Sequence, residues 1–321
     1  MDHLLSVWAW SLAVLQALLV LAAAPLLVGW VRRVKARLQN RKGPPLTQPY
    51  RELAKLLTKE ALVAHTASPV FRAAPYIVFG ATWIATATLP SLATGLPSAA
   101  VADVVVLAGF LALARFFLAL AGLDVGTAFG GMGSSREMMI SALAEPAMLT
   151  AVFTITMTAH TTNLSGVMEQ LLGAPLALRP SILFALGALA LVAIAETGRI
   201  PIDNPATHLE LTMIHEAMIL EYSGRHLALM EWAAQLKLLL YGTLIANVFF
   251  PWGVATVLKP SALAFAALAL AGKLAVLGVL LALAETTLAK MRLFRAPLFL
   301  NLAFLLALLG MFSHVILEVG A

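Results

Sequence analysis

The sequence predicts an all-α polytopic membrane protein with about eight transmembrane helices and one amphipathic helix on the cytoplasmic side. Of the 321 residues, 61% are hydrophobic and only 12% are charged, whereas a soluble domain is about half apolar and about a quarter charged. The mean hydropathy of +0.92 points the same way. Apolar runs of about twenty residues recur along the chain, and such a run crosses ~30 Å of hydrocarbon. We therefore expect residues 1–321 to form a single membrane domain and not a soluble multi-domain protein.

Eight apolar runs are long enough to span the membrane. We expect these spans at Leu4–Val31, Pro69–Pro90, Ala99–Ala121, Met138–His160, Ser181–Ile200, Trp232–Val257, Ala262–Ala289 and Ala296–Leu317. The first run is too long for the core of a signal peptide, and its N-terminal flank is not basic, so we expect a retained first span. No stretch alternates between polar and apolar residues for long enough to suggest a transmembrane barrel.

Lysine and arginine residues concentrate in alternate loops. The loop after the first span carries nine of them, and the loops after the third, fifth and seventh spans carry six more, whereas the intervening loops hold only Arg179 and Lys259. Cytoplasmic loops are enriched in Lys and Arg. We therefore expect a multi-pass protein of the cell inner (cytoplasmic) membrane with both termini outside. Because the basic residues are spread over short loops, the net charge of +5 does not indicate nucleic-acid binding.

The first loop, residues 32–62, combines a basic segment with a predicted amphipathic helix. After the Gly43-Pro44-Pro45 break, Leu46, Tyr50, Leu53 and Leu56 recur at three- and four-residue steps. This spacing predicts a helix that lies on the membrane surface or under a partner protein. The alternative is a basic loop that only sets the topology.

The segment GTAFGGMGSSREMM, residues 126–139, is rich in glycine but does not predict a phosphate-binding loop. The Walker spacing is missing and no soluble strand precedes the segment. Ser134 and Glu137 have the spacing of a capping box, which predicts that the fourth span begins there.

Charged residues also lie inside the predicted spans. Among them are Arg115, Glu145, Glu196, Lys237, Lys273 and Glu285. A charge near the bilayer centre costs ~2.5–3.5 kcal/mol on insertion scales, so these groups must pair or line a hydrated interior. One alternative is structural ion pairs and snorkelling lysines. For Glu145 and Glu196 we favour proton transfer, because a short carboxylate cannot snorkel far, with Arg115 as the counter-charge.

The most polar stretch is AETGRIPIDNPATHLELTMIHEAMILEYSG, residues 195–224, which overlaps a predicted cytoplasmic polar loop at 200–226. Asp203, Glu210 and Glu221 are candidate proton-uptake groups or partner contacts beside the membrane. His208 and His215 are seven residues apart, whereas two histidines that bind one metal on a helix are usually four apart, so we expect no metal site here.

This polar stretch, together with FGGMGSSRE and the GP and QP pairs of the first loop, carries a family resemblance over most of the chain. It resembles the membrane-anchor subunit of membrane-bound NiFe-hydrogenases of the formate hydrogenlyase and hydrogenase-4 type, which is related to the membrane-anchor subunit of NADH:quinone oxidoreductase (complex I). The complex I branch usually has carboxylates at the places of Ala206 and His208, and is about three residues shorter before EYSG. These differences favour the hydrogenase branch.

The resemblance implies a non-catalytic subunit that anchors a soluble redox module and contributes a proton path coupled to electron transfer. It also implies partners, namely the soluble hydrogenase large and small subunits, iron–sulfur subunits and antiporter-like membrane subunits. We expect the NiFe centre and iron–sulfur clusters in those partners, since this chain has no cysteine to ligate them. The alternative is the quinone-site membrane subunit of a complex I-like NADH:quinone oxidoreductase. A stand-alone ion carrier is disfavoured because no repeat symmetry is evident.

The residues expected to act fall into two groups. The predicted proton path comprises Glu145, Glu196, Arg115, Glu210, Glu221, Asp203 and Glu285. The predicted docking surface comprises Arg37, Arg41, Lys42, Tyr50, Lys55 and Arg199. We expect no catalytic, cofactor-binding or metal-binding residue in this chain.

Overall fold

The computed structural model describes residues 2–173, 179–199, 203, 213–289, 291 and 295–319. Its long helices and short helical segments follow one another along the chain. In order they are α1 (Asp2–Leu38), α2 (Gln48–Leu57), α3 (Pro69–Thr88), η1 (Pro97–Val101), α4 (Val104–Asp124), α5 (Ala128–Thr158), α6 (Leu164–Gly173), α7 (Pro180–Glu196), α9 (His215–Ile219), α10 (Gly224–Leu244), η2 (Ile245–Phe249), α11 (Pro260–Thr287), α12 (Ala296–Ser313) and η4 (His314–Val319).

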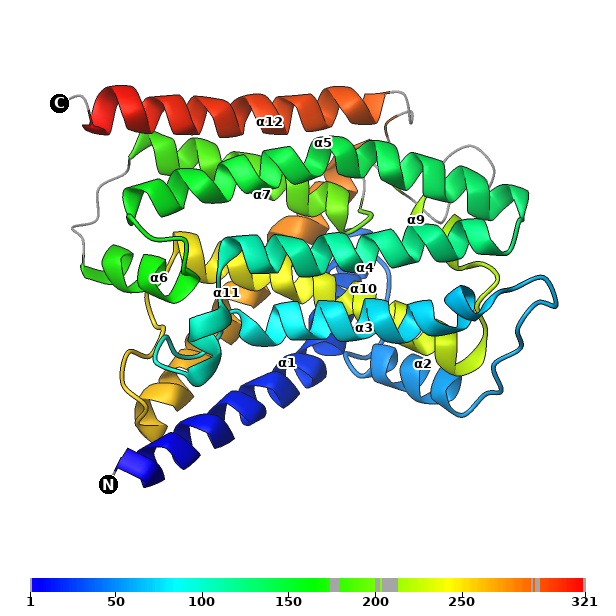
Figure 1. The fold of residues 1–321 in the computed structure, drawn as a ribbon, viewed down its shortest axis with the longest axis horizontal. Coiled ribbons are helices and arrows are strands. Elements are labelled where there is room, and N and C mark those ends of the chain that lie inside the picture. Colours follow the sequence, from blue (N-terminus) through cyan, green and yellow to red (C-terminus); the bar gives the residue numbers. More distant parts are fainter. Residues whose placement is uncertain are drawn as a thin grey trace.

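The predicted fold class is confirmed. Within the described residues, seven helices are long and apolar enough to cross a membrane, and α7 is a shorter apolar helix. Each of the eight predicted spans has its helix, and the only strand-like pairing in the described chain is two isolated bridges. Both termini lie at the end of the bundle that carries α6, and α2 and α9 lie at the opposite end (Figure 1), which we call the α2 end.

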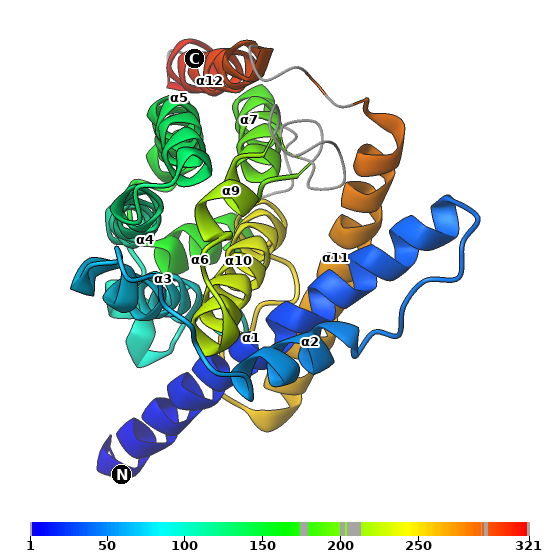
Figure 2. The same cartoon turned by 90° about the vertical axis from the view of Figure 1, so that its right-hand side faces the viewer.

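Helix α1 is longer than predicted and crosses the bundle obliquely (Figures 1 and 2). It continues past Val31 to Leu38, so the first basic residues expected in a loop lie on its last two turns. Pro25 lies inside α1 and has no N–H to offer the carbonyl of Leu21. The indole of Trp232 donates to that carbonyl at 3.1 Å. This bond matters because an unsatisfied backbone group in hydrocarbon is costly.

Helix α5 begins ten residues before the predicted fourth span, and the predicted capping box is wrong. Thr127 is the N-cap, and its hydroxyl accepts from the Gly130 amide at 3.3 Å. Ser134 lies inside the helix and donates to the Ala119 carbonyl of α4 at 2.9 Å. The glycines permit close helix packing, since a Cβ at Gly130 would collide with the carbonyl of Gly122.

The predicted amphipathic helix is confirmed as α2. Leu53 is buried against the bundle, and the hydroxyl of Tyr50 donates to the Ala22 carbonyl of α1. On the outer side, Arg32 of α1 forms an ion pair with Glu52 at 2.7 Å. The apolar side of α2 thus packs on α1 and α10, while its basic residues remain exposed.

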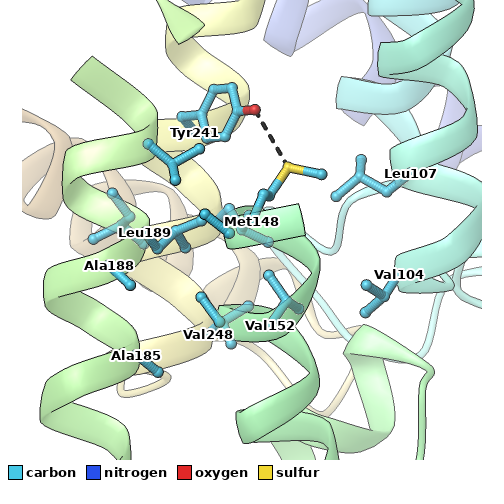
Figure 3. Close-up of a cluster of buried hydrophobic side chains, with 14 of the residues drawn as sticks. Val104, Leu107, Met148, Val152, Ala185, Ala188, Leu189, Tyr241 and Val248 are labelled. Atoms are coloured by element: carbon cyan, nitrogen blue, oxygen red, sulfur yellow. Dashed lines mark hydrogen bonds between the residues drawn. The ribbon is translucent and has the colours of Figure 1, made fainter. Parts of the chain in front are cut away.

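The bundle has a dense part and an open part. Helices α5, α7 and α12 pack together, and α3 packs on both α4 and α10. Helix α11 packs mainly on α1 and stands apart from α7 and α12 (Figure 2). An apolar cavity of about 410 Å³ lies between α1, α7, α10 and α11. The largest buried apolar cluster of the described residues draws on α4, α5, α7, α10 and α12, and Figure 3 shows its part around Met148 and Tyr241.

Candidate functional site

A buried ion cluster links three helices at mid-bundle. Arg115 of α4 contacts Glu145 of α5 at 2.5 Å through Nη1, and Glu196 at the end of α7 at 3.2 Å through Nη2. The side chains of Arg115 and Glu196 are 4% and 2% exposed. Arg115 lies nine residues before the end of α4, which is ~14 Å along the helix. An arginine at this depth is stabilised only by such partners.

Lys237 of α10 completes the cluster, because its Nζ lies 2.7 Å from Oε2 of Glu196. Glu196 therefore contacts two cations, Arg115 and Lys237. A third carboxylate, Glu137 of α5, lines a small cavity together with Arg115 and Lys237. These described residues make two cations and three carboxylates, so the cluster is neutral when it holds one proton. The cluster therefore has one carboxylate more than it has cations, and such an imbalance is costly in a low-dielectric interior.

Glu145 differs from the other members of the cluster in its exposure. Its side chain is 40% exposed on the flank of α5, although the helix is a membrane span. Pro146 follows it, and the Thr150 hydroxyl donates back to the Pro146 carbonyl at 2.7 Å. Glu145 therefore connects the buried cluster with the outer surface of the bundle.

A polar cavity of about 340 Å³ lies at the α2 end, between α1, α7, α9, α10 and α11. Glu285 of α11 is buried on its wall and binds Lys35 at 2.5 Å and Arg199 at 3.1 Å. Its other ionisable lining residues are Arg32, Asp203, His215, Glu216 and Glu231. Because the lining carries both signs of charge and the volume holds several waters, the cavity is suited to a hydrated proton reservoir.

Backbone contacts hold α9 against the wall of this cavity. Oδ2 of the buried Asp203 accepts from the Ile214 amide at 3.3 Å and from the His215 amide at 3.2 Å. Arg136 of α5 donates to the Met213 carbonyl at 2.9 Å. Burial, with a smaller contribution from Asp203, raises the pKa of Glu216. This carboxyl group is therefore poised to take up a proton at higher pH than an exposed one.

A second cavity of about 30 Å³ separates the polar cavity from the ion cluster. Ionisable side chains on its wall are Arg115, Glu137, His215 and Lys237. Nε of Arg115 is buried and has no protein hydrogen-bond partner in the described chain. The volume accommodates about one water molecule, which would satisfy this donor.

Beyond the cluster, the described core around Met148 is apolar. The hydroxyl of Tyr241 donates to Sδ of Met148 at 3.3 Å, and Leu189, Val152 and Val248 surround this pair (Figure 3). A thioether is a weak acceptor, so this contact does not continue the network of charged groups. The charged groups of the cluster therefore adjoin the polar cavity at the α2 end and do not continue towards the α6 end.

The structure brings together most of the predicted proton-path residues. Arg115, Glu145 and Glu196 form one cluster, and Asp203 and Glu285 line the adjacent polar cavity. Glu221 is exposed and lines neither cavity. Glu210 lies outside the described residues.

The predicted docking residues divide into two sets. Exposed at the α2 end are Arg37, Arg41, Lys42 and Lys55. Tyr50 instead turns inward to α1, and Arg199 binds Glu285 on the cavity wall. These two residues therefore have internal contacts that the sequence did not predict.

Sequence reasoning misses or undervalues three site residues. Glu137 resembles part of a helix cap, Glu231 has no distinguishing pattern, and Lys237 is compatible with either snorkelling or pairing. The sequence signal that could have identified Glu137 is Thr127, the N-cap of α5. A helix that starts at Thr127 places Glu137 almost three turns inside α5 and not in a helix cap.

Comparisons with known proteins match this geometry. The family model described as NADH dehydrogenase matches residues 10–315. Formate hydrogenlyase subunit 4 of Escherichia coli (strain K12) is 35% identical over 283 residues, covering 88% of this chain and 91% of that protein. Hydrogenase-4 component C of the same strain is 32% identical, covering 87% and 88%.

A solved structure has the same fold. A chain of the membrane-bound sulfane sulfur reductase, an archaeal respiratory membrane complex, superposes with a TM-score of 0.79 at 19% identity and covers 94% of this chain and 98% of that chain. The family model spans nearly the whole chain, and the relatives above are homologous over most of their length. This integral membrane protein therefore belongs to the NADH dehydrogenase family of complex I-like membrane subunits.

Proposed function

We propose that this chain is the membrane anchor and proton-path subunit of a membrane-bound NiFe-hydrogenase complex of the formate hydrogenlyase type. The single observation that carries the proton path is the cluster of Arg115, Glu145, Glu196 and Lys237, which lies between a polar cavity at the α2 end and the flank of α5. The hydrogenase assignment is supported by the two homologous hydrogenase subunits.

The proposed path begins in the polar cavity and ends at Glu145. Protons would enter among Glu216, Glu231 and Glu285, reach the cluster around Glu196, and leave through the exposed carboxylate of Glu145. A carboxylate open to hydrocarbon is costly. We therefore assign the flank of α5 to an antiporter-like membrane subunit that covers Glu145 and takes the proton onward.

The soluble hydrogenase large and small subunits and the iron–sulfur subunits would dock on the α2 end. Its exposed cations are Arg37, Arg41, Lys42 and Lys55. The NiFe centre and the iron–sulfur clusters belong to those partners in this proposal. The α2 end then faces the cytoplasm, and both termini face outward across the cell inner membrane, in agreement with the distribution of Lys and Arg.

Charge-neutral substitutions in the whole complex test the proton path. Glu145→Gln and Glu196→Gln keep side-chain shape but cannot exchange a proton. We expect both variants to retain subunit abundance in the membrane and to lose most of the redox-linked proton uptake by vesicles, with slower turnover if the two processes are tightly coupled. Glu169→Gln, on exposed α6 at the other end, is the matched control and should behave as wild type.

The result that would overturn the relay is normal proton movement in both variants. Loss of the complex from the membrane would instead assign these carboxylates to structural ion pairs, since removal of one buried partner leaves the other charge stranded.

A second candidate is the quinone-site subunit of a complex I-like NADH:quinone oxidoreductase, which the matching family model favours. Analysis of the purified native complex separates the two candidates. Nickel together with iron supports the hydrogenase, whereas flavin and bound quinone support the alternative.

A further inference from the structure

The two polar cavities have one ionisable residue in common. The 340 Å³ cavity at the α2 end and the 30 Å³ cavity beside the ion cluster share only His215 and Ala234 in their described linings. Ala234 offers no group that transfers protons. Any proton that passes from the larger cavity to the smaller one along this wall therefore meets the imidazole of His215.

His215 is held at this boundary by its surroundings. It opens α9, its amide donates to Asp203, and its Cβ lies 3.8 Å from the position that a Cβ on Gly198 would occupy. Gly198 has a φ of +59°, a conformation that L residues rarely adopt. Helix α9 itself packs on α4 and α5, which carry Arg115 and Glu137 of the small cavity.

We propose that His215 is the proton-transfer residue that joins the cytoplasmic cavity to the ion cluster. This inference rests on the proton path proposed above. One ring nitrogen accepts a proton from a water in the 340 Å³ cavity, and the other ring nitrogen gives its proton to the water position in the 30 Å³ cavity. That water delivers a proton to the carboxylate of Glu137. A tautomer exchange then restores the ring, so no net charge stays on the imidazole.

The charges around His215 favour the neutral ring that this step needs. Burial and the nearby Lys237 lower the pKa of His215 to about 4, although Asp203 opposes the shift. The ring is therefore uncharged at neutral pH, with one nitrogen able to accept and the other able to donate. The charged and titratable groups that face the two cavities or its own helix are Arg32, Lys35, Arg115, Glu137, Arg199, Asp203, Glu216, Glu231, Lys237 and Glu285.

The test compares two histidines at the α2 end of the native complex reconstituted in vesicles. His215→Ala removes the ring, and His226→Gln is the control. His226 is buried and its ring makes edge contacts with Tyr76 and Tyr222, but it lines neither cavity. We expect His215→Ala to lower redox-linked proton uptake at least tenfold, because positioned acid–base groups contribute ~10²–10⁴-fold, and His226→Gln to keep it.

Chemical rescue distinguishes proton transfer from a structural role. The adjoining cavity admits imidazole, so added imidazole should restore proton uptake in His215→Ala and should not restore it in Glu196→Gln. If Glu196→Gln is impaired while His215→Ala is normal, the inference is wrong and the proposed path stands without it. If both variants are normal, the path itself is wrong. Impairment of His215→Ala without rescue by imidazole would assign His215 to structure and overturn the inference.

Discussion

Arg115 is the group whose loss should have the largest structural effect on this protein. Its guanidinium contacts two carboxylates on two different helices, Glu145 on α5 and Glu196 on α7, from within α4. We expect Arg115→Gln to destabilise the chain, because Glu145 then loses its cation and Glu196 keeps only Lys237.

The expected loss of stability follows from the ion-pair contacts that remain in Arg115→Gln. Breaking a buried ion pair by removing one partner costs ~3–5 kcal/mol. Here Glu196 keeps Lys237 at 2.7 Å, and Glu145 is 40% exposed, so we expect the lower limit, ~3 kcal/mol. For a chain of this length ~1 kcal/mol shifts the melting temperature by about 2 °C, which gives a decrease of ~6 °C.

The assay is thermal unfolding of the purified complex, followed by loss of this subunit. Arg115→Lys is the matched control, because it keeps the charge but cannot contact both carboxylates with separate nitrogens. Its loss of stability should be about half that of Arg115→Gln. The double variant Arg115→Gln with Glu196→Gln should be more stable than the sum of the single changes predicts, by at least ~1 kcal/mol. Additive effects, or an unchanged melting temperature in Arg115→Gln, would refute the proposal that Arg115 stabilises the bundle through its contacts with Glu145 and Glu196.

Three further predictions concern topology, docking and backbone strain. Cysteines introduced at Lys42 and Lys259 should label from opposite sides of the membrane, and labelling from one side would exclude the proposed orientation. Charge reversal at Arg37 and Arg41 should release the soluble subunits while the anchor still inserts; if the complex stays assembled, the basic end only sets topology. Gly224→Ala should destabilise the start of α10 by ~1–3 kcal/mol, because φ is +51° and a Cβ would collide with the carbonyl of a preceding loop; an unchanged melting temperature would contradict this.

The sequence predicts the spans well because a helix needs about twenty apolar residues to cross the bilayer. It fails at the start of α5, where Gly130, Gly131 and Gly133 suggest a loop. All three are helical, and at Gly130 and Gly133 the missing side chain lets neighbouring elements approach closely. At Gly133 only about 3.0 Å separates a hypothetical Cβ from Ala217 of α9. Such an approach depends on tertiary packing, which local propensity does not report.

The sequence predicts which residues belong to the candidate site better than it predicts which of them contact one another. A charge within an apolar span must find a partner, so Arg115, Glu145 and Glu196 stand out from composition alone. The pairing of carboxylates with cations depends on which helices are neighbours in the fold. Arg115 is 30 residues from Glu145 and 81 residues from Glu196 along the chain, and these separations do not encode which helices are neighbours. Lys237 remained ambiguous for the same reason, since a long stem could equally have reached an interface.

The distribution of polar groups along the bundle sets the direction of the proposed path. From the α2 end, ionisable side chains continue inward as far as Arg115 and Glu196, and then the apolar packing around Tyr241 and Met148 interrupts them. Lys273, nearer the α6 end, bonds the Phe250 carbonyl at 2.6 Å and the Asn247 side chain at 3.3 Å, so both of these acceptors are neutral. A proton that reaches the cluster therefore meets apolar packing ahead and the exposed carboxylate of Glu145 at its side. In the function proposed above, coupling to the far side of the membrane would require a neighbouring subunit on α5, and this chain would carry charge sideways from the redox module into that neighbour.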